Sequence, residues 1–155
     1  MPQPRKYPRP EGFTATARFH VRYADTDQMG HVYYANYLIY FEMARSEWMR
    51  SAGLPYSKFE NMGYIVPVVE AHVRYRRRIF YDDLVEVKTG VKPVSKTRFR
   101  FSYEVRRAGE EPILADGWTV HTVLDGDGRP QRIPDLFLDM MERHAGGGEP
   151  GETRD

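Results

Sequence analysis

The chain has 155 residues and a net charge of +1, so it is long enough for one domain with a sizeable core, and its charge balance excludes a general nucleic-acid binder. Hydrophobic residues make up 41% and charged residues 29% of the chain, which is typical of a soluble globular protein. The absence of cysteine excludes disulfides, thiolate nucleophiles and cysteine zinc sites, and it is consistent with a cytoplasmic location. No apolar run approaches the roughly 20 residues that span a bilayer, so we expect no stable membrane association.

The two ends of the chain have the composition of flexible segments. Residues 1–12 (MPQPRKYPRPEG) are basic and rich in proline, and they lack the apolar stretch of a signal peptide. Residues 145–155 (AGGGEPGETRD) combine glycine with charged residues. We therefore expect a flexible N-terminal arm over 1–12, a single domain over 13–144 and a flexible tail over 145–155.

The first predicted elements are a strand and a long helix. Apolar and polar residues alternate over 13–23, which indicates a half-buried strand, and a turn follows over 25–30. Residues 33–52 predict one helix, because Gly53 supplies a C-terminal stop and Pro55 follows it. The first half of this helix, YYANYLIYF, is apolar on every side, so we expect it to be buried, whereas the charged second half emerges.

Four further strands are predicted after the helix. Their patterns cover residues 65–78, 85–92, 98–106 and 114–124, and a short helix over about 134–144 ends the domain. This order predicts an α+β fold in which an antiparallel sheet of about five strands wraps around one long central helix. Because the open edges of a single sheet often pair between subunits, we also expect a homo-oligomer.

Two aspartates precede the helix in the stretch DTDQMGHVYYANY, residues 25–37. The ordinary explanation is helix capping, since aspartate is a preferred N-cap residue. One cap needs only one residue, however, and Asp27 lies several residues before the apolar run. A helix N-terminus also presents unpaired N–H groups and a positive dipole end, which can stabilise an oxyanion beside a carboxylate. We interpret Asp25 as structural, holding the loop through backbone amides, and both capping and catalysis stay open for Asp27.

The chain resembles a known enzyme family in this region. The stretch VRYADTDQMGHVYYANYLIYFEMARSEW resembles the signature of the 4-hydroxybenzoyl-CoA thioesterase family, which includes the YbgC-type members. The later stretches RRIFYDDLVEV and VSKTRFRFSYEV are similar to strands of that family. The resemblance implies a hotdog fold, an acyl-CoA thioesterase that works as a dimer or tetramer, and no cofactor, because coenzyme A is part of the substrate.

The resemblance also implies roles for particular residues. Matched by position, Asp27 is the catalytic carboxylate, and the backbone N–H of Tyr34, helped by Tyr33, binds the thioester carbonyl oxygen. Gly30 permits the sharp bend before the helix. His31 occupies a position where many relatives have histidine, and a core histidine bonded to the backbone is the competing interpretation.

Two basic stretches are candidates for binding the phosphates of coenzyme A, which require exposed Lys or Arg. The resemblance points to the turn VSKTRFR, with Lys96, Thr97 and Arg98, and the segment RYRRRIF adds Arg77. For each single residue, the alternative is an ordinary solvated strand face.

Several mechanistic alternatives stay open in the sequence. Asp27 can act as a general base toward water or as a nucleophile that forms a mixed anhydride. Glu42 is an alternative carboxylate, since another branch of hotdog thioesterases uses a helix glutamate, but Arg45 at i+3 suggests an ordinary ion pair. Aromatic and aliphatic acyl groups are both compatible with the chain.

The alternative function is a non-catalytic hotdog module that binds acyl-CoA or an acyl carrier and does not need Asp27. A nucleic-acid partner is not expected, because the net charge is near zero and no reading motif is present. The 5 histidines show no metal-ligand spacing, so we expect no metal site.

Overall fold

The computed structural model describes residues 15–144, so the predicted arm, the tail and the first two residues of the first strand lie outside the described part. The elements in chain order are β1 (Ala15–His20), the 3-10 helix η1 (Tyr23–Asp25), α1 (Asn36–Ser51), α2 (Tyr56–Asn61), β2 (Val68–Tyr75), β3 (Leu84–Pro93), β4 (Arg98–Arg107), β5 (Ile113–Leu124), β6 (Pro130–Gln131) and α3 (Asp135–His144).

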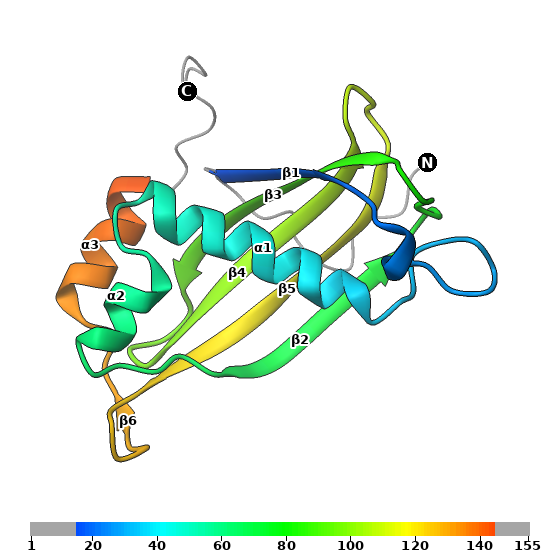
Figure 1. Ribbon diagram of the computed structural model, residues 1–155. Helices are drawn as coiled ribbons and strands as arrows, with labels where there is room; N and C mark the ends of the chain where they lie inside the picture. The colour runs from blue at the N-terminus through cyan, green and yellow to red at the C-terminus, as the bar shows by residue number, and fades with distance from the viewer. Residues whose placement is uncertain (1–14, 145–155) are drawn as a thin grey trace, which may run out of the picture.

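The strands form one antiparallel sheet that curves around α1. Its order is β1-β3-β4-β5-β2, and the two-residue strand β6 pairs with β5. Figure 1 shows α1 crossing one face of this sheet, with α2 and α3 grouped where α1 ends. The predicted sheet of about five strands around one long helix is confirmed, while β6 and the short helix α2 were not predicted.

The helix α1 begins at Asn36, three residues later than predicted. The reason is that residues 33–35 form a turn that is bonded to the preceding loop. The Tyr33 N–H donates to the Asp25 carbonyl oxygen at 2.9 Å, and the Asn36 N–H donates to the Tyr33 carbonyl oxygen at 2.9 Å. The loop of the two aspartates therefore fixes where the helix starts.

The first half of α1 is not buried on every side, so that prediction is wrong for the single chain. Tyr37, Tyr40 and Phe41 are buried, but Leu38 and Ile39 are 41% and 49% exposed. The sheet covers only one side of the helix (Figure 1). An apolar strip on the other side of α1 consequently faces outward.

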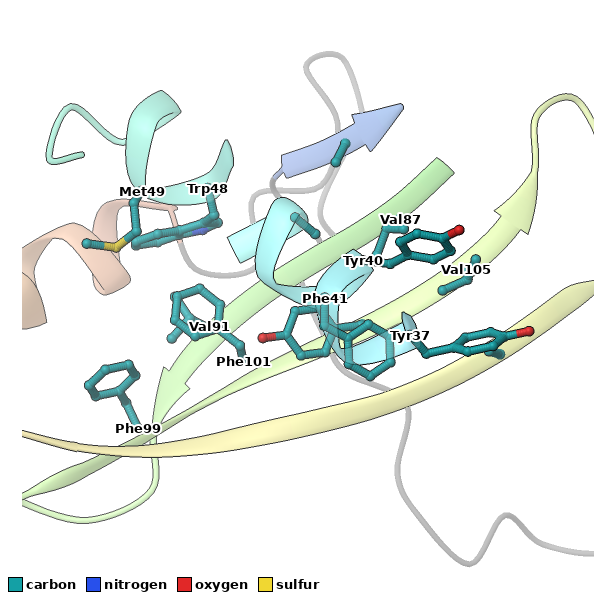
Figure 2. Close-up of a cluster of buried hydrophobic side chains, with 14 of the residues drawn as sticks. Tyr37, Tyr40, Phe41, Trp48, Met49, Val87, Val91, Phe99, Phe101 and Val105 are labelled. Carbon is teal, nitrogen blue, oxygen red and sulfur yellow. The ribbon is translucent and has the colours of Figure 1, made fainter. Parts of the chain in front are cut away.

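The core between α1 and the sheet combines aliphatic side chains with several aromatic rings, some of which Figure 2 shows. The Phe41 ring lies flat on the ring of Tyr103, with centroids 4.1 Å apart and planes 5° from parallel. Further along α1, Trp48 meets the edge of Phe101 with centroids 5.7 Å apart. Offset and edge-to-face ring pairs add about 1 kcal/mol each to the free energy gained by burial.

Gly117 allows three elements to approach each other at the centre of this core. It lies in β5 between Tyr103 of β4 and Val73 of β2. A Cβ placed on Gly117 would lie 2.0 Å from the carbonyl oxygen of His72 and 3.0 Å from the ring of Phe41. Only a residue without a side chain fits, because a backbone carbonyl in a strand has little freedom to retreat.

We expect Gly117→Ala to lower the free energy of unfolding by at least about 3 kcal/mol, because the added methyl group overpacks the β2–β5 pairing. Chemical denaturation of the variant measures this loss. Gly126→Ala is the control, since a Cβ at Gly126 would meet nothing within 4 Å. Equal stability of both variants would show that β2 moves away from β5 without cost.

Candidate active site

The stretch between η1 and α1 is a small hairpin with Asp27 at the start of its tip. Thr26 and Val32 form an antiparallel bridge, and the Asp27 N–H donates to the His31 carbonyl oxygen at 3.0 Å. Gly30 has φ 84°, a left-handed conformation that favours glycine, so it makes the sharp bend expected there. The Asp27 carboxylate oxygen Oδ1 accepts the Met29 N–H at 2.9 Å. Asp27 thus shapes its own turn, and Oδ2 accepts no hydrogen bond from residues 15–144.

Neither aspartate caps α1, so the capping interpretation is wrong for this helix. The N-cap residue is Ala35, and no side chain caps it. The buried Asp25 instead joins the loop to the helix: its carboxylate accepts the backbone N–H of Arg22 at 3.1 Å, the Arg22 guanidinium at 2.8 Å and the Tyr40 hydroxyl at 2.9 Å. Its interpretation as a structural residue is confirmed, although side chains supply most of its partners.

The electrostatics of Asp25 follow from these contacts. Burial by itself raises the pKa of the Asp25 carboxyl, but the hydrogen bonds from Arg22 and Tyr40 and the charge of Arg22 outweigh burial and lower the pKa. Burial and the hydrogen bond to Asp25 both raise the pKa of Tyr40 above its ordinary value. Asp25 is therefore ionised and Tyr40 protonated at neutral pH.

The backbone just before α1 offers N–H groups without an acceptor among residues 15–144, those of Tyr34 and Ala35. The Tyr33 N–H is bonded to Asp25, as described above, whereas the Tyr34 N–H has no acceptor among residues 15–144. The Tyr34 carbonyl oxygen accepts the Tyr75 hydroxyl at 2.9 Å, which ties this turn to the end of β2. The pKa of the Tyr33 hydroxyl is raised, chiefly by the Tyr34 side chain and in addition by the charge of Asp27. The charge of Asp27 is therefore felt at the Tyr33 hydroxyl.

A groove of about 220 Å³ opens at the same place. Its lining includes Tyr34 and Tyr37 from the start of α1, His31 from the hairpin, and the basic residues that follow β2: Arg76, Arg77 and Arg78. The His31 ring nitrogen Nδ1 lies 3.2 Å from the Val32 carbonyl oxygen. The groove thus brings together three of the residues singled out in the sequence, His31, Tyr34 and Arg77, whereas Asp27 is not part of its lining and is joined to His31 through the backbone.

The other predicted phosphate-binding residues lie elsewhere in the chain's own fold. Lys96 and Thr97 belong to the turn between β3 and β4, where the Lys96 carbonyl oxygen accepts the Ile133 N–H at 2.9 Å, and Arg98 is the first residue of β4. The strand β3 starts at Leu84 opposite His20, near the Asp27 hairpin, and runs away from it. A strand of this length spans roughly 30 Å, so this turn and Asp27 lie at opposite ends of one sheet.

A second cavity of about 300 Å³ lies between α1, α2 and the sheet. Most of its lining is apolar, but Glu42, Arg45 and His121 also contribute to it. The predicted ion pair between Glu42 and Arg45 is wrong, because no carboxylate of residues 15–144 lies within 4 Å of Arg45. Arg45 instead donates to the Tyr103 hydroxyl at 3.3 Å. The alternation of β5 would have placed His121 on the inner face, yet nothing in the sequence joined it to Arg45.

A chain of hydrogen bonds runs from Arg45 through the core in one direction only. Arg45 can only donate, so it fixes the Tyr103 hydroxyl as its acceptor. The Val66 carbonyl oxygen can only accept, so the His121 nitrogen Nδ1, 3.1 Å away, carries the proton. In between, the Tyr103 hydroxyl donates to Thr119 over 2.6 Å, and Thr119 donates to the Nε2 of His121 over 2.9 Å.

Burial and the fixed direction of these hydrogen bonds both keep the His121 ring neutral. Burial, with the charge of Arg45 as a smaller cause, lowers the pKa of His121 to about 4. A proton on Nε2 would also point at the Thr119 oxygen, so that the hydroxyl hydrogen of either Thr119 or Tyr103 would lose its acceptor. Such a buried unpaired donor costs about 1–3 kcal/mol.

Residues 15–144 contain neither a cluster of metal-binding side chains nor a helix that could cross a membrane. Among residues 15–144, no three His, Asp or Glu side chains gather closely enough to hold a metal ion. Within the same residues, no helix has the length and apolar character needed to cross a membrane.

Comparisons with known proteins agree on one family. A family model described as the thioesterase-like superfamily matches residues 21–141. The chain is 31% identical over 115 residues to a 1,4-dihydroxy-2-naphthoyl-CoA hydrolase of Thermosynechococcus vestitus, which covers 74% of this chain and 77% of that protein. Among solved structures, the DHNA-CoA thioesterase of Staphylococcus aureus has 34% identity and a TM-score of 0.75, with 83% of this chain and 86% of that chain covered. Protein TT1821 of Thermus thermophilus has 37% identity and a TM-score of 0.78, with 84% and 98% covered.

The two aspartates are expected to differ in their contribution to stability. Asp25→Asn removes the charge that Arg22 and Tyr40 bind, so we expect the free energy of unfolding to fall by about 2 kcal/mol, the range for hydrogen bonds to a charged group. Asp27→Asn keeps an oxygen for the Met29 N–H and is expected to change stability by less than about 0.5 kcal/mol. Denaturant titration at pH 7 compares the two; equal losses would contradict the separate roles.

Proposed function

We propose that this chain, which belongs to the thioesterase-like superfamily of thioester hydrolases, cleaves acyl-CoA thioesters to a free acid and coenzyme A. The observation that carries the proposal is that the hairpin leading into α1 holds a carboxylate with a free oxygen, Asp27 Oδ2, and is followed by the Tyr34 N–H, which has no acceptor among residues 15–144. Hydrolysis of a thioester requires a group that delivers oxygen to the carbonyl carbon and a donor that binds the oxyanion formed there. This site has one of each.

In this mechanism the Tyr34 N–H binds the carbonyl oxygen of the thioester. Tyr34 lies one residue before the N-cap Ala35, so its N–H belongs to the turn that leads into α1, next to the end of the helix to which the dipole gives a partial positive charge. Negative charge develops on the carbonyl oxygen when the carbon is attacked, so a donor fixed in advance stabilises that state. Removal of one such donor typically costs about 3 kcal/mol of activation free energy.

Asp27 then supplies or activates the attacking oxygen through Oδ2. As a general base, it takes a proton from water while the water oxygen bonds to the carbonyl carbon; the C–S bond then breaks and the thiolate of coenzyme A leaves. As a nucleophile, its own oxygen bonds to the carbonyl carbon and forms a mixed anhydride, which water hydrolyses. A single turnover in H₂¹⁸O separates the two, because only the nucleophilic route transfers an unlabelled protein oxygen to the first product.

The site is completed, in this proposal, by a second copy of the chain. The outer edge of β2 has no strand partner among residues 15–144, and Val68 and Val69 on it are 45% and 43% exposed. Two such edges related by a two-fold axis pair antiparallel, so the second copy has its sheet reversed end to end. Its turn with Lys96, Thr97 and Arg98 then lies at the same end as Asp27 of the first copy. This arrangement gives the phosphates basic contacts besides Arg77.

We expect Asp27→Asn to lower kcat for acyl-CoA hydrolysis on the order of a hundredfold or more, because the amide can neither take a proton nor attack. Release of free coenzyme A across a panel of aromatic and aliphatic acyl-CoAs measures this. Asp127→Asn, in the turn between β5 and β6, is the control with unchanged kcat.

Two other results would contradict the catalytic role of Asp27 or the thioesterase function itself. A fully active Asp27→Asn protein would rule out a catalytic Asp27 and make Glu42 the next candidate. Binding of acyl-CoAs without turnover by the wild-type chain would favour the non-catalytic binding module instead.

The proposed pairing also predicts the mass of the protein in solution. The wild type should sediment at two or four times the 18.1 kDa of one chain. Val69→Lys places a charge on the edge strand and should shift the protein toward the monomer, whereas Val94→Lys, equally exposed in the turn after β3, should not. A monomeric wild-type protein would contradict the shared site.

A further inference from the structure

The second cavity combines an apolar lining with a cation that has no counter-ion. Rings of Phe99, Phe101 and Phe137 form much of its surface. The guanidinium of Arg45, which is half-buried, also lines it. This hollow lies beside the second half of α1 and is separate from the groove at the Tyr34 turn.

Most of the hydrogen-bonding capacity of Arg45 is unused. A guanidinium has five N–H donors, and the only bond that Arg45 makes within residues 15–144 is the one to the Tyr103 hydroxyl. The exposed Glu42 lines the same cavity but lies more than 4 Å from Arg45, so it does not occupy these donors. Arg45 is only partly buried, so its remaining donors stay open to a ligand, and a ligand oxygen would bind them through charge-assisted hydrogen bonds.

The remaining polar groups of the cavity cannot take over that role. Both ring nitrogens of His121 are occupied: Nδ1 donates to the Val66 carbonyl oxygen, and Nε2 accepts the Thr119 hydroxyl. Arg45 is the donor at the start of this series of hydrogen bonds. This series of hydrogen bonds therefore holds Arg45 in place through the Tyr103 hydroxyl, and it offers no acceptor to a ligand in the cavity. A ligand in this cavity meets aromatic rings and a cluster of N–H donors.

The proposed two-fold pairing connects this cavity with the reacting thioester. A symmetric pairing of the full strand β2, Val68–Tyr75, sets Val68 of one copy opposite Tyr75 of the other. Val68 lines the cavity, and Tyr75 is bonded to the Tyr34 turn. The cavity of one chain thus opens beside the oxyanion donor of the second copy, where an acyl group must extend from its carbonyl carbon.

We infer, on the basis of the proposed thioesterase function, that this cavity holds the acyl group and that Arg45 selects acyl groups carrying an acceptor oxygen, such as a carboxylate or a phenolic oxygen, remote from the thioester. Plain alkyl and phenyl acyl groups of the same length fill the same space but leave the guanidinium without a partner. Discrimination by a site built for a polar group is strong, because the wrong substrate leaves buried donors unpaired.

The test compares matched pairs of substrates that differ in this oxygen. Glutaryl-CoA with pentanoyl-CoA, and 3-hydroxybenzoyl-CoA with benzoyl-CoA, are hydrolysed by the wild type and by Arg45→Met. The wild type should prefer the oxygenated member of at least one pair by about tenfold to a hundredfold in kcat/KM, the range for a hydrogen bond to a charged group. Arg45→Met should lose this preference mainly through a higher KM, while the unsubstituted members change by less than about threefold.

Further variants separate recognition from folding. Arg45→Lys keeps the charge without the fork of donors and should retain part of the preference. Arg132→Met removes an exposed arginine elsewhere and should retain all of it. Thermal melting shows whether Arg45→Met is folded; if it is not, the preference of Arg45→Lys relative to the wild type decides.

Each outcome tests either the selection of acyl groups by Arg45 or the hydrolysis of acyl-CoA. No preference in the wild type, or an equal preference in Arg45→Met, overturns the role of Arg45 while turnover itself still supports the thioesterase. If no acyl-CoA is turned over, the proposed function fails, and calorimetric Kd values for the same four compounds then test the cavity. Equal affinities within both pairs would overturn the inference as well.

Discussion

The buried Asp25 carboxylate is the contact on which the site depends. It binds Arg22 at the end of the first strand and Tyr40 inside the central helix, while its backbone carbonyl oxygen accepts the N–H of Tyr33 and the side-chain amide of Asn36. One residue thereby fixes the strand, the hairpin and the first turn of α1 relative to each other. The consequence is a fixed turn before α1 in which the Tyr34 N–H has no acceptor among residues 15–144.

The D-x-D pair thus divides two tasks that a single carboxylate could not combine. A carboxylate that holds three elements together has its oxygens saturated with donors, and its lowered pKa makes it a poor base. Asp27, two residues later, accepts the Met29 N–H of its own turn with Oδ1, and its Oδ2 accepts no hydrogen bond from residues 15–144. Asp25 therefore positions the hairpin that carries Asp27, the residue that we propose as catalytic.

A similar division appears in the core, where polar groups cross an aromatic layer. Tyr103 carries the stacked ring of Phe41 on its face and passes a hydrogen bond from Arg45 toward His121 through its hydroxyl. The apolar packing and the one-way hydrogen bonds therefore share the same side chain. The guanidinium at the end of this chain is held at a cavity wall, which a purely apolar core would not provide.

The sequence predicted the fold class and the order of the main elements, because alternation and helix periodicity are encoded in neighbouring residues. The roles of Asp25 and Asp27 already differed in that prediction, although the proximity of Tyr40 to Asp25, fifteen positions away, did not follow from it. Only the tertiary structure decided that Arg45 meets Tyr103 instead of Glu42, that Gly117 admits no side chain and that Lys96 lies far from Asp27 in one chain. These facts depend on how strands and helices are placed against each other, and the periodicity of a single segment carries no information about its partner.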